Sequence, residues 1–251
     1  MNTAFLRVYE ELNNFLPLER RKTRFEHHFR DNPSIKDIIE SIGIPHTEVD
    51  LILINGKSVD FSARVQDRDF VSIYPVFESF DIKGISKVRP SPLRKTKFIV
   101  DTHLGKLARY LRMLGFDTLY KPEYSPGEII QLALKEHRII LSNSRELLKH
   151  KSITHGYCIN NYNPLDQLRK VVQRFFLWDK MVPFSLCMLC NAGLQPITKE
   201  EILDRLPPKV KKGQQEFKIC PVCQRIYWKG THYEKMMRMI EKLGNSDRSR
   251  G

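Results

Sequence analysis

Apolar and polar positions follow two different periods along the first 80 residues. Residues 5–9 alternate in the manner of a strand, whereas Ser34 precedes isoleucines at helical spacing that stop before a glycine. The apolar run 51–54 enters the Asn-Gly turn at 55–56, which predicts a hairpin, and residues 70–75 predict a final strand ended by proline. The predicted order is strand, strand, helix, strand, strand, strand. This order indicates a small α+β domain over residues 1–82.

A second pattern, in which strands and helices alternate, begins at residue 97. The predicted strands are 97–101, 116–120, 138–142 and 156–159, and the predicted helices are 104–114, 126–137, 145–148 and 164–177. Ser125 and Glu128 form a capping-box pattern around a proline at the first helical position. Strands separated by helices predict a parallel sheet with helices on both faces over residues 97–180.

Three further segments complete the predicted organisation. Residues 83–96 are basic, contain two prolines and lack an apolar pattern, so they predict a linker. Residues 181–240 hold two cysteine pairs around a short helix that begins at a Thr198 capping box. We expect residues 241–251 to form a disordered tail.

Charge and cysteine usage narrow the class of partner. Lys plus Arg number 42 and Asp plus Glu 29 among 251 residues, a formal charge of +13 that favours a polyanion, with nucleic acid first. No apolar run approaches the roughly 18 residues of a membrane span, and no signal pattern opens the chain. We therefore expect a cytoplasmic protein without a membrane partner. Among five cysteines, Cys158 stands alone and fits a small buried residue.

The two CxxC pairs predict a structural zinc site. Cys187 and Cys190 form one pair, Cys220 and Cys223 the other, and 29 residues separate the pairs. Four thiolates complete the tetrahedron that zinc prefers and leave no open position for water. Four independent cysteines or a redox pair are the alternatives, but a redox motif would leave the second pair unexplained.

Asp101 follows a buried strand, at the edge of a parallel sheet where ligands bind. A carboxylate there is a candidate ligand for Mg²⁺ or Mn²⁺, although a helix cap or a turn explains it equally well. On the next helix Lys106, Arg109 and Arg112 recur every third residue, which suits phosphate binding or a solvated basic face. Glu128 is a possible second acid and equally a helix N-terminal charge.

Aromatic residues alternate with cations in the stretch 225–235. Trp228 and its neighbours fit stacking on unpaired bases, with Lys229 on a phosphate, and they fit packing over the small ribbon equally well. The prediction for RNA contacts comprises Lys106, Arg109, Arg112, Arg145, Trp228 and Lys229.

Together these motifs resemble the Mut-seven C-terminal RNase family. The resemblance rests on residues 98–101, 104–117 and 227–233 and on both cysteine pairs. It implies an α/β PIN-like nuclease fold with a parallel sheet and a C-terminal zinc ribbon. The first 80 residues, notably 45–50 and 55–56, resemble the ubiquitin-like β-grasp domain that precedes it. No Gly-Gly ends that domain, so sulfur transfer is not expected.

One departure from the family pattern concerns catalysis. The family usually shows Thr-Arg-Asp after the third strand, whereas this chain has Ser142-Asn143-Ser144. The resemblance therefore implies a Mg²⁺- or Mn²⁺-dependent endoribonuclease of low activity, with Asp101 as metal ligand and Glu128 as helper. The alternatives are a catalytically degenerate RNA-binding or ribosome-associated module, and an adaptor that binds a protein partner through its β-grasp domain.

Overall fold

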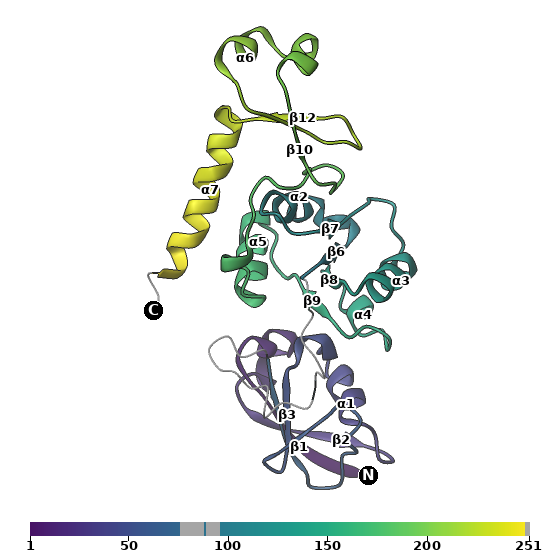
Figure 1. Cartoon of the computed structure of the whole chain (residues 1–251). Helices are drawn as coiled ribbons and strands as arrows, with labels where there is room; N and C mark the ends of the chain where they lie inside the picture. The colour runs from purple at the N-terminus through teal and green to yellow at the C-terminus, as the bar shows by residue number, and fades with distance from the viewer. Residues whose placement is uncertain (76–87, 89–95, 249–251) are drawn as a thin grey trace. The chain divides into compact units, whose positions relative to one another are not determined.

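The computed structural model describes residues 1–75, Val88 and 96–248, with side chains through Leu243 (Figure 1). Apart from Val88 and Thr96, the predicted linker 83–96 lies outside the described residues. The chain divides into two compact units. The first comprises residues 1–103 and 121–160, and the second comprises residues 104–120 and 161–251.

A mixed five-stranded sheet in the order β2-β1-β5-β3-β4 opens the first unit. Its strands are β1 (Asn2–Val8), β2 (Arg24–Phe29), β3 (Leu51–Ile54), β4 (Lys57–Val59) and β5 (Phe70–Tyr74). β1 and β5 run parallel, and the other neighbours run antiparallel. Helix α1 (Ile35–Ser41) begins at Ser34, whose hydroxyl forms the capping box with Asp37. The predicted order of strands and helix is therefore the observed one.

The other sheet of this unit contains the parallel strands β6 (Phe98–Val100), β8 (Ile139–Ser142) and β9 (Gly156–Cys158). Every residue of β6 and β8 is buried, and the apolar residues 98–100 and 139–141 form the core of the sheet. Helices α3 (Pro126–Glu136) and α4 (Arg145–Leu148) pack on these strands. This arrangement places Asp101 and Ser142 together at the carboxyl ends of β6 and β8.

The β-grasp part contacts β9 and α4 within the same unit. In the short helix His46–Glu48, the His46 Nε2 atom lies 2.6 Å from the Ile153 carbonyl oxygen, and Glu48 accepts a hydrogen bond from the Cys158 amide. The Cys158 thiol is 3% exposed, as expected for a small buried residue. Burial and the Glu48 carboxylate raise the pKa of Cys158 to about 12.

The second unit combines helices with a small antiparallel ribbon. Its helices are α2 (Gly105–Met113), α5 (Pro164–Arg174), α6 (Pro208–Gly213) and α7 (Thr231–Arg248). Its strands are β7 (Thr118–Leu119), β10 (Gln195–Ile197), β11 (Phe217–Ile219) and β12 (Ile226–Trp228), and the last three pair in the order β10-β11-β12. Ile202, Leu206 and Phe217 form the buried core of the ribbon.

Helix α7, yellow in Figure 1, differs from the prediction of a disordered tail. It continues to Arg248, whereas disorder was expected from residue 241. The sequence 231–243 carries apolar residues at helical spacing, a signal that the prediction of a tail overlooked. Residues 249–251 lie outside the described part. No helix in the described ranges is both long and apolar enough to cross a membrane.

Candidate functional site

The two CxxC turns have the same backbone structure. In the first, the amide of Asn191 donates to the Cys187 carbonyl at 2.9 Å, and in the second Gln224 donates to Cys220 at the same distance. Each turn closes with a second hydrogen bond from the amide of its first cysteine. Asn191 and Gln224 both have positive φ, 70° and 57°, which bends each turn so that two sulfurs face one point. The sequence therefore builds two matching halves of a site.

The four sulfur atoms come together as one cluster. The Sγ atoms of Cys187, Cys190, Cys220 and Cys223 all lie within 4.8 Å of one another. A tetrahedron with Zn–S bonds of about 2.3 Å has sulfurs about 3.8 Å apart, and the Cys187–Cys223 distance is 3.6 Å. The donor set and the spacing fit zinc, and the four-cysteine cluster can hold such a metal. The expected pairing of the two motifs is thus present.

The thiols do not share one electrostatic environment. Burial raises the pKa of Cys190 to about 12. Burial acts in the same direction on Cys187, but the Tyr227 hydroxyl and the amides of Cys190 and Leu189 donate to its sulfur and lower its pKa to about 6. The Tyr227 oxygen lies 3.1 Å from this sulfur. A bound divalent metal would favour deprotonation of all four ligands.

Arg112 is a structural residue of this centre, which corrects the expectation of three exposed cations on α2. Its side chain is 3% exposed and donates from Nε to the Thr118 carbonyl at 2.9 Å. Its Nη1 donates to the carbonyls of Met188 and Leu189 in the first cysteine turn, at 3.3 and 2.5 Å. A buried guanidinium that already donates to three carbonyls is not available to a phosphate.

Asn191 makes the second connection between the first cysteine turn and the segment after α2. Its side-chain oxygen accepts from the Thr118 amide at 2.9 Å, and its side-chain nitrogen donates to the Asp117 carboxylate at 2.6 Å. The sequence pattern gave no sign of these contacts because a side chain's partner across a fold leaves no periodicity. The centre is therefore attached to α2 by side chains as well as by the chain.

Asp101 lies where the sequence predicts, directly after β6. One oxygen of its carboxylate accepts from the Thr102 amide at 2.6 Å, and the other accepts from the Ser142 hydroxyl at 2.6 Å. Ser142 is fully buried at the end of β8. The side chain thus has the turn role that the sequence allowed, at the carboxyl ends of two parallel strands.

Ser144, the residue at the expected carboxylate position, is the N-cap of α4. Its hydroxyl accepts from the Leu147 amide at 3.2 Å, and its own amide donates to the Ser142 hydroxyl. Glu128 is engaged in the capping box of α3, where hydrogen bonds from the Ser125 amide and hydroxyl lower its pKa. Across the described residues, the four cysteines form the only group of three or more His, Cys, Asp or Glu side chains placed to hold a metal.

A groove of about 810 Å³ opens in the second unit between α2, the first cysteine turn, β12 and α7. Four cations line it, and none of them makes an ion pair or a side-chain hydrogen bond within the described part of the chain: Lys106, Arg109, Arg225 and Lys235. The lining also contains methionine and aromatic side chains and no Asp or Glu. Lys106 and Arg109 therefore lie in a groove, as part of a basic surface that the sequence did not delimit.

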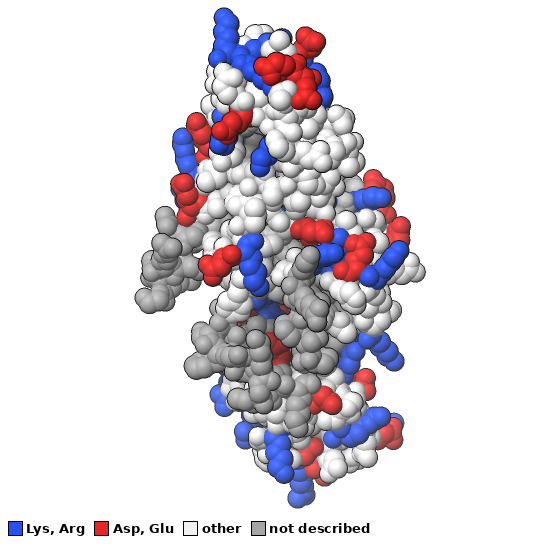
Figure 2. Space-filling view, viewed as in Figure 1, with Lys and Arg blue, Asp and Glu red and all other residues white. Residues whose placement is uncertain are grey.

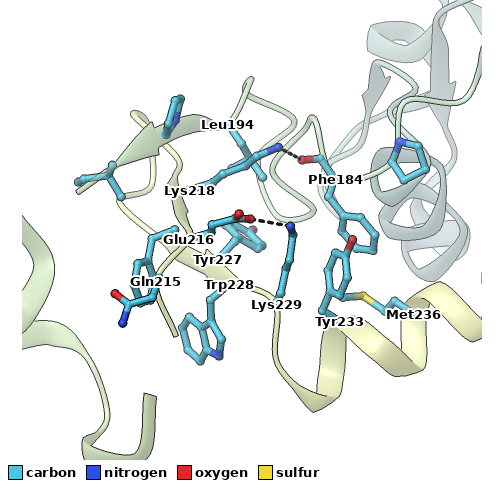
Figure 3. A pocket seen from close by; sticks show the side chains of 14 residues that line it. Phe184, Leu194, Gln215, Glu216, Lys218, Tyr227, Trp228, Lys229, Tyr233 and Met236 are labelled. Carbon is cyan, nitrogen blue, oxygen red and sulfur yellow. Dashed lines mark hydrogen bonds and ion pairs between the residues drawn. The ribbon is translucent and has the colours of Figure 1, made fainter. Parts of the chain in front are cut away.

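The aromatic stretch has divided roles. Tyr227 faces Cys187, whereas Trp228 packs against the ribbon core and still lines the groove. The ammonium of Lys229 lies 2.5 Å from the Glu216 carboxylate, and both residues line a second pocket of about 420 Å³. Figure 3 marks this ion pair with a dashed line. Lys229 thus pairs with a carboxylate and lines this second pocket rather than the groove, so it is a weaker candidate for a phosphate contact than the groove cations.

Arg145 lies in the first unit, at the start of α4. Its guanidinium stands 4.8 Å from the centre of the Phe15 ring. On the face drawn in Figure 2, blue Lys and Arg side chains lie interspersed with red Asp and Glu. The excess of positive charge is therefore not gathered into one patch on that face, and the groove is distinguished by its lack of acids.

Comparisons with known proteins agree with this architecture. A model of the Mut7-C RNAse domain matches residues 96–240, more than half of the chain, and a model described as Mut7-C ubiquitin matches residues 1–81. These matches confirm the resemblance and the fold inferred from the motifs, and the first indicates a nuclease-like function. None of the curated proteins or solved structures compared with the chain matches it.

Proposed function

Because this chain belongs to the family of the Mut7-C RNAse domain, we propose that it is a cytoplasmic ribonuclease of low activity that requires Mg²⁺ or Mn²⁺. The observation that carries the proposal is the position of Asp101 beside Ser142, where the carboxyl ends of the neighbouring strands β6 and β8 meet. Carboxylate oxygens are the ligands that these hard cations prefer. Asp101 would hold the ion, and Glu128 would help only after giving up its capping hydrogen bonds.

The proposed low activity follows from the donor set. A bound divalent cation would neutralise charge on a phosphate and polarise water. Magnesium sites that do this work usually include one or two carboxylates together with phosphate oxygens. Here one carboxylate is surrounded by hydroxyls, so the donors fit a weak site that fills in the millimolar range, as an order of magnitude.

A second candidate is an RNA-binding module that does not cleave. It is favoured by Ser144, which serves as a helix cap where the family supplies an acid, and by Asp101, whose two oxygens already accept hydrogen bonds. The scaffold would then bind RNA in this protein without supporting a metal. One set of variants separates the two candidates.

The test is cleavage of labelled RNA by the full chain across a titration of Mg²⁺ and Mn²⁺. Ser144→Asp keeps a good N-cap while adding the missing carboxylate, and Ser144→Asn keeps the cap without charge, which makes it the matched control. We expect Ser144→Asp to raise the rate about tenfold or more, and Asp101→Asn to abolish cleavage in both backgrounds. Brisk cleavage that survives Asp101→Asn would refute the site, and absence of cleavage in every variant would favour the binding module.

The protein partner expected at the β-grasp domain remains a prediction. The exposed Phe70 stacks on Phe5 at 5.2 Å between ring centres, and Arg24 lies over it. Substitution of Phe70 is the most direct way to test whether this face of the sheet binds another protein.

A further inference from the structure

We propose that the groove of the second unit binds a single-stranded segment of RNA, which rests on the proposed function because it names how the substrate is held. The groove brings together cations from three places: Lys106 and Arg109 on α2, Arg225 in the ribbon, and Lys235 on α7. All four are exposed and lack an acidic partner within the described ranges. The phosphates of a nucleic acid would supply the negative charge that no described neighbouring side chain provides.

The apolar part of the lining favours single-stranded RNA over a duplex. Met113, Met188, Met236 and Met239 line the groove together with Tyr110, Trp228 and Tyr233. A duplex keeps its bases stacked inside and presents sugars and phosphates, whereas a single strand offers unstacked base faces to aromatic and apolar side chains. An acid-free rim over an apolar lining therefore suits a single strand better than a duplex.

An apolar helix of a partner protein is the other ligand that a methionine-lined groove can accept. The charge distinguishes the two. An amphipathic helix would need acidic residues matched to each of four separated cations, while every nucleotide of RNA carries a phosphate. The groove thus fits a polyanion with apolar faces.

The zinc centre forms part of this groove. Met188 and Leu189 stand between Cys187 and Cys190, and both line the groove. The buried Arg112 holds this turn through the Met188 and Leu189 carbonyls, although its own side chain is not in the lining. Loss of zinc should therefore weaken RNA binding without any change in the four cations.

The test measures binding by fluorescence anisotropy, in Asp101→Asn protein without Mg²⁺ or Mn²⁺, so that affinity is read apart from cleavage. The probes are a labelled oligonucleotide of unstructured RNA, the same RNA annealed to its complement, and a peptide that forms an acidic amphipathic helix. Lys106→Glu with Arg109→Glu removes two groove cations. Lys209→Glu with Lys212→Glu makes the same change, at the same spacing, on the exposed face of α6 outside the groove.

We expect tighter binding to the single strand than to the duplex, with a log–log salt slope of about −3 for four phosphate contacts. The groove variant should lose about tenfold or more in affinity and halve the slope, whereas the α6 variant should change little. Chelation of zinc should weaken binding in the unsubstituted groove.

Three results would overturn the proposal. Equal losses of RNA affinity in the two double variants would mean that RNA binds through the net charge of the protein and not at the groove. Tighter binding of the duplex or of the peptide would name a different ligand. Wild-type affinity in the groove variant, together with Asp101-dependent cleavage in the natural protein, would remove the groove and leave the proposed nuclease intact. Failure of the nuclease alone would appear as binding at the groove without cleavage.

Discussion

Arg112 offers the sharpest test of the structural argument, because the sequence assigns it to RNA and the structure places it against the first turn of the four-cysteine cluster. Arg112→Met keeps the length of the buried side chain and removes its donors. The two short hydrogen bonds, to Thr118 and Leu189, contribute about 1.5–3 kcal/mol each because the donor is charged. The longer bond to Met188, at 3.3 Å, adds less.

Burial offsets part of this gain, since desolvation of the guanidinium is the main cause that lowers the pKa of Arg112. Removing the charge recovers that cost but leaves backbone carbonyls without a donor. We expect Arg112→Met to lower the free energy of unfolding by about 2–4 kcal/mol. It should also weaken zinc retention, because the first cysteine turn loses its support.

Arg109→Met, on the same helix, is the matched control. Its side chain is exposed and has no partner in the described structure, so we expect a change within about 0.5 kcal/mol. The assay is urea unfolding combined with release of zinc to a coloured chelator. The salt slope of RNA binding, measured with zinc in excess, should respond in the opposite way: it should fall by about 0.7 for Arg109→Met and stay unchanged for Arg112→Met. Equal stability of the two variants would refute the assignment of Arg112 as an anchor.

Two other predictions concern the centre and its neighbourhood. Elemental analysis should find one zinc ion per chain, and Cys220→Ser should abolish it. A thiol reagent at pH 8 should find no reactive cysteine before chelation and four after it, because loss of the metal unfolds the ribbon around them. Cys158, which is buried in the first unit, should react only when that unit unfolds. Gly115→Ala should cost about 2 kcal/mol or more, because Gly115 has a φ of 92° and an added Cβ would lie 2.3 Å from the Val182 carbonyl oxygen. Gly127→Ala, where an added Cβ meets nothing within 4 Å, should be neutral or stabilising by up to about 1 kcal/mol; equal effects at the two glycines would contradict this account.

Local signals in the sequence were sufficient for the elements of both domains. The capping boxes at Ser34 and Ser125 begin α1 and α3 as predicted, because a cap and the helix it starts are neighbours in the chain. The cysteine cluster was also predictable, since zinc needs four soft ligands and the motifs supply four. The helix caps depend on residues that are close in the sequence, and the cysteine cluster depends on the chemistry of cysteine alone.

Features that depend on distant partners were not predictable in this way. The periodicity of α2 places Arg112 next to Leu111 and gives no indication that its guanidinium is buried against Met188 and Leu189. The groove likewise combines residues more than 100 positions apart, from Lys106 to Lys235. The role of Arg112 and that of the groove cations both depend on neighbours that only the folded chain brings close.

The separation of the two cysteine turns has a consequence for how the protein is made. Cys190 and Cys220 are 30 residues apart, so the second turn leaves the ribosome about 1.5–6 s after the first at ordinary rates of synthesis. During that interval the first turn already has its anchors available, because Arg112 on α2 and the partners of Asn191 after α2 all precede Cys220 in the chain. The ribbon should therefore assemble onto a prepared half-site, with metal capture as the last step of its folding.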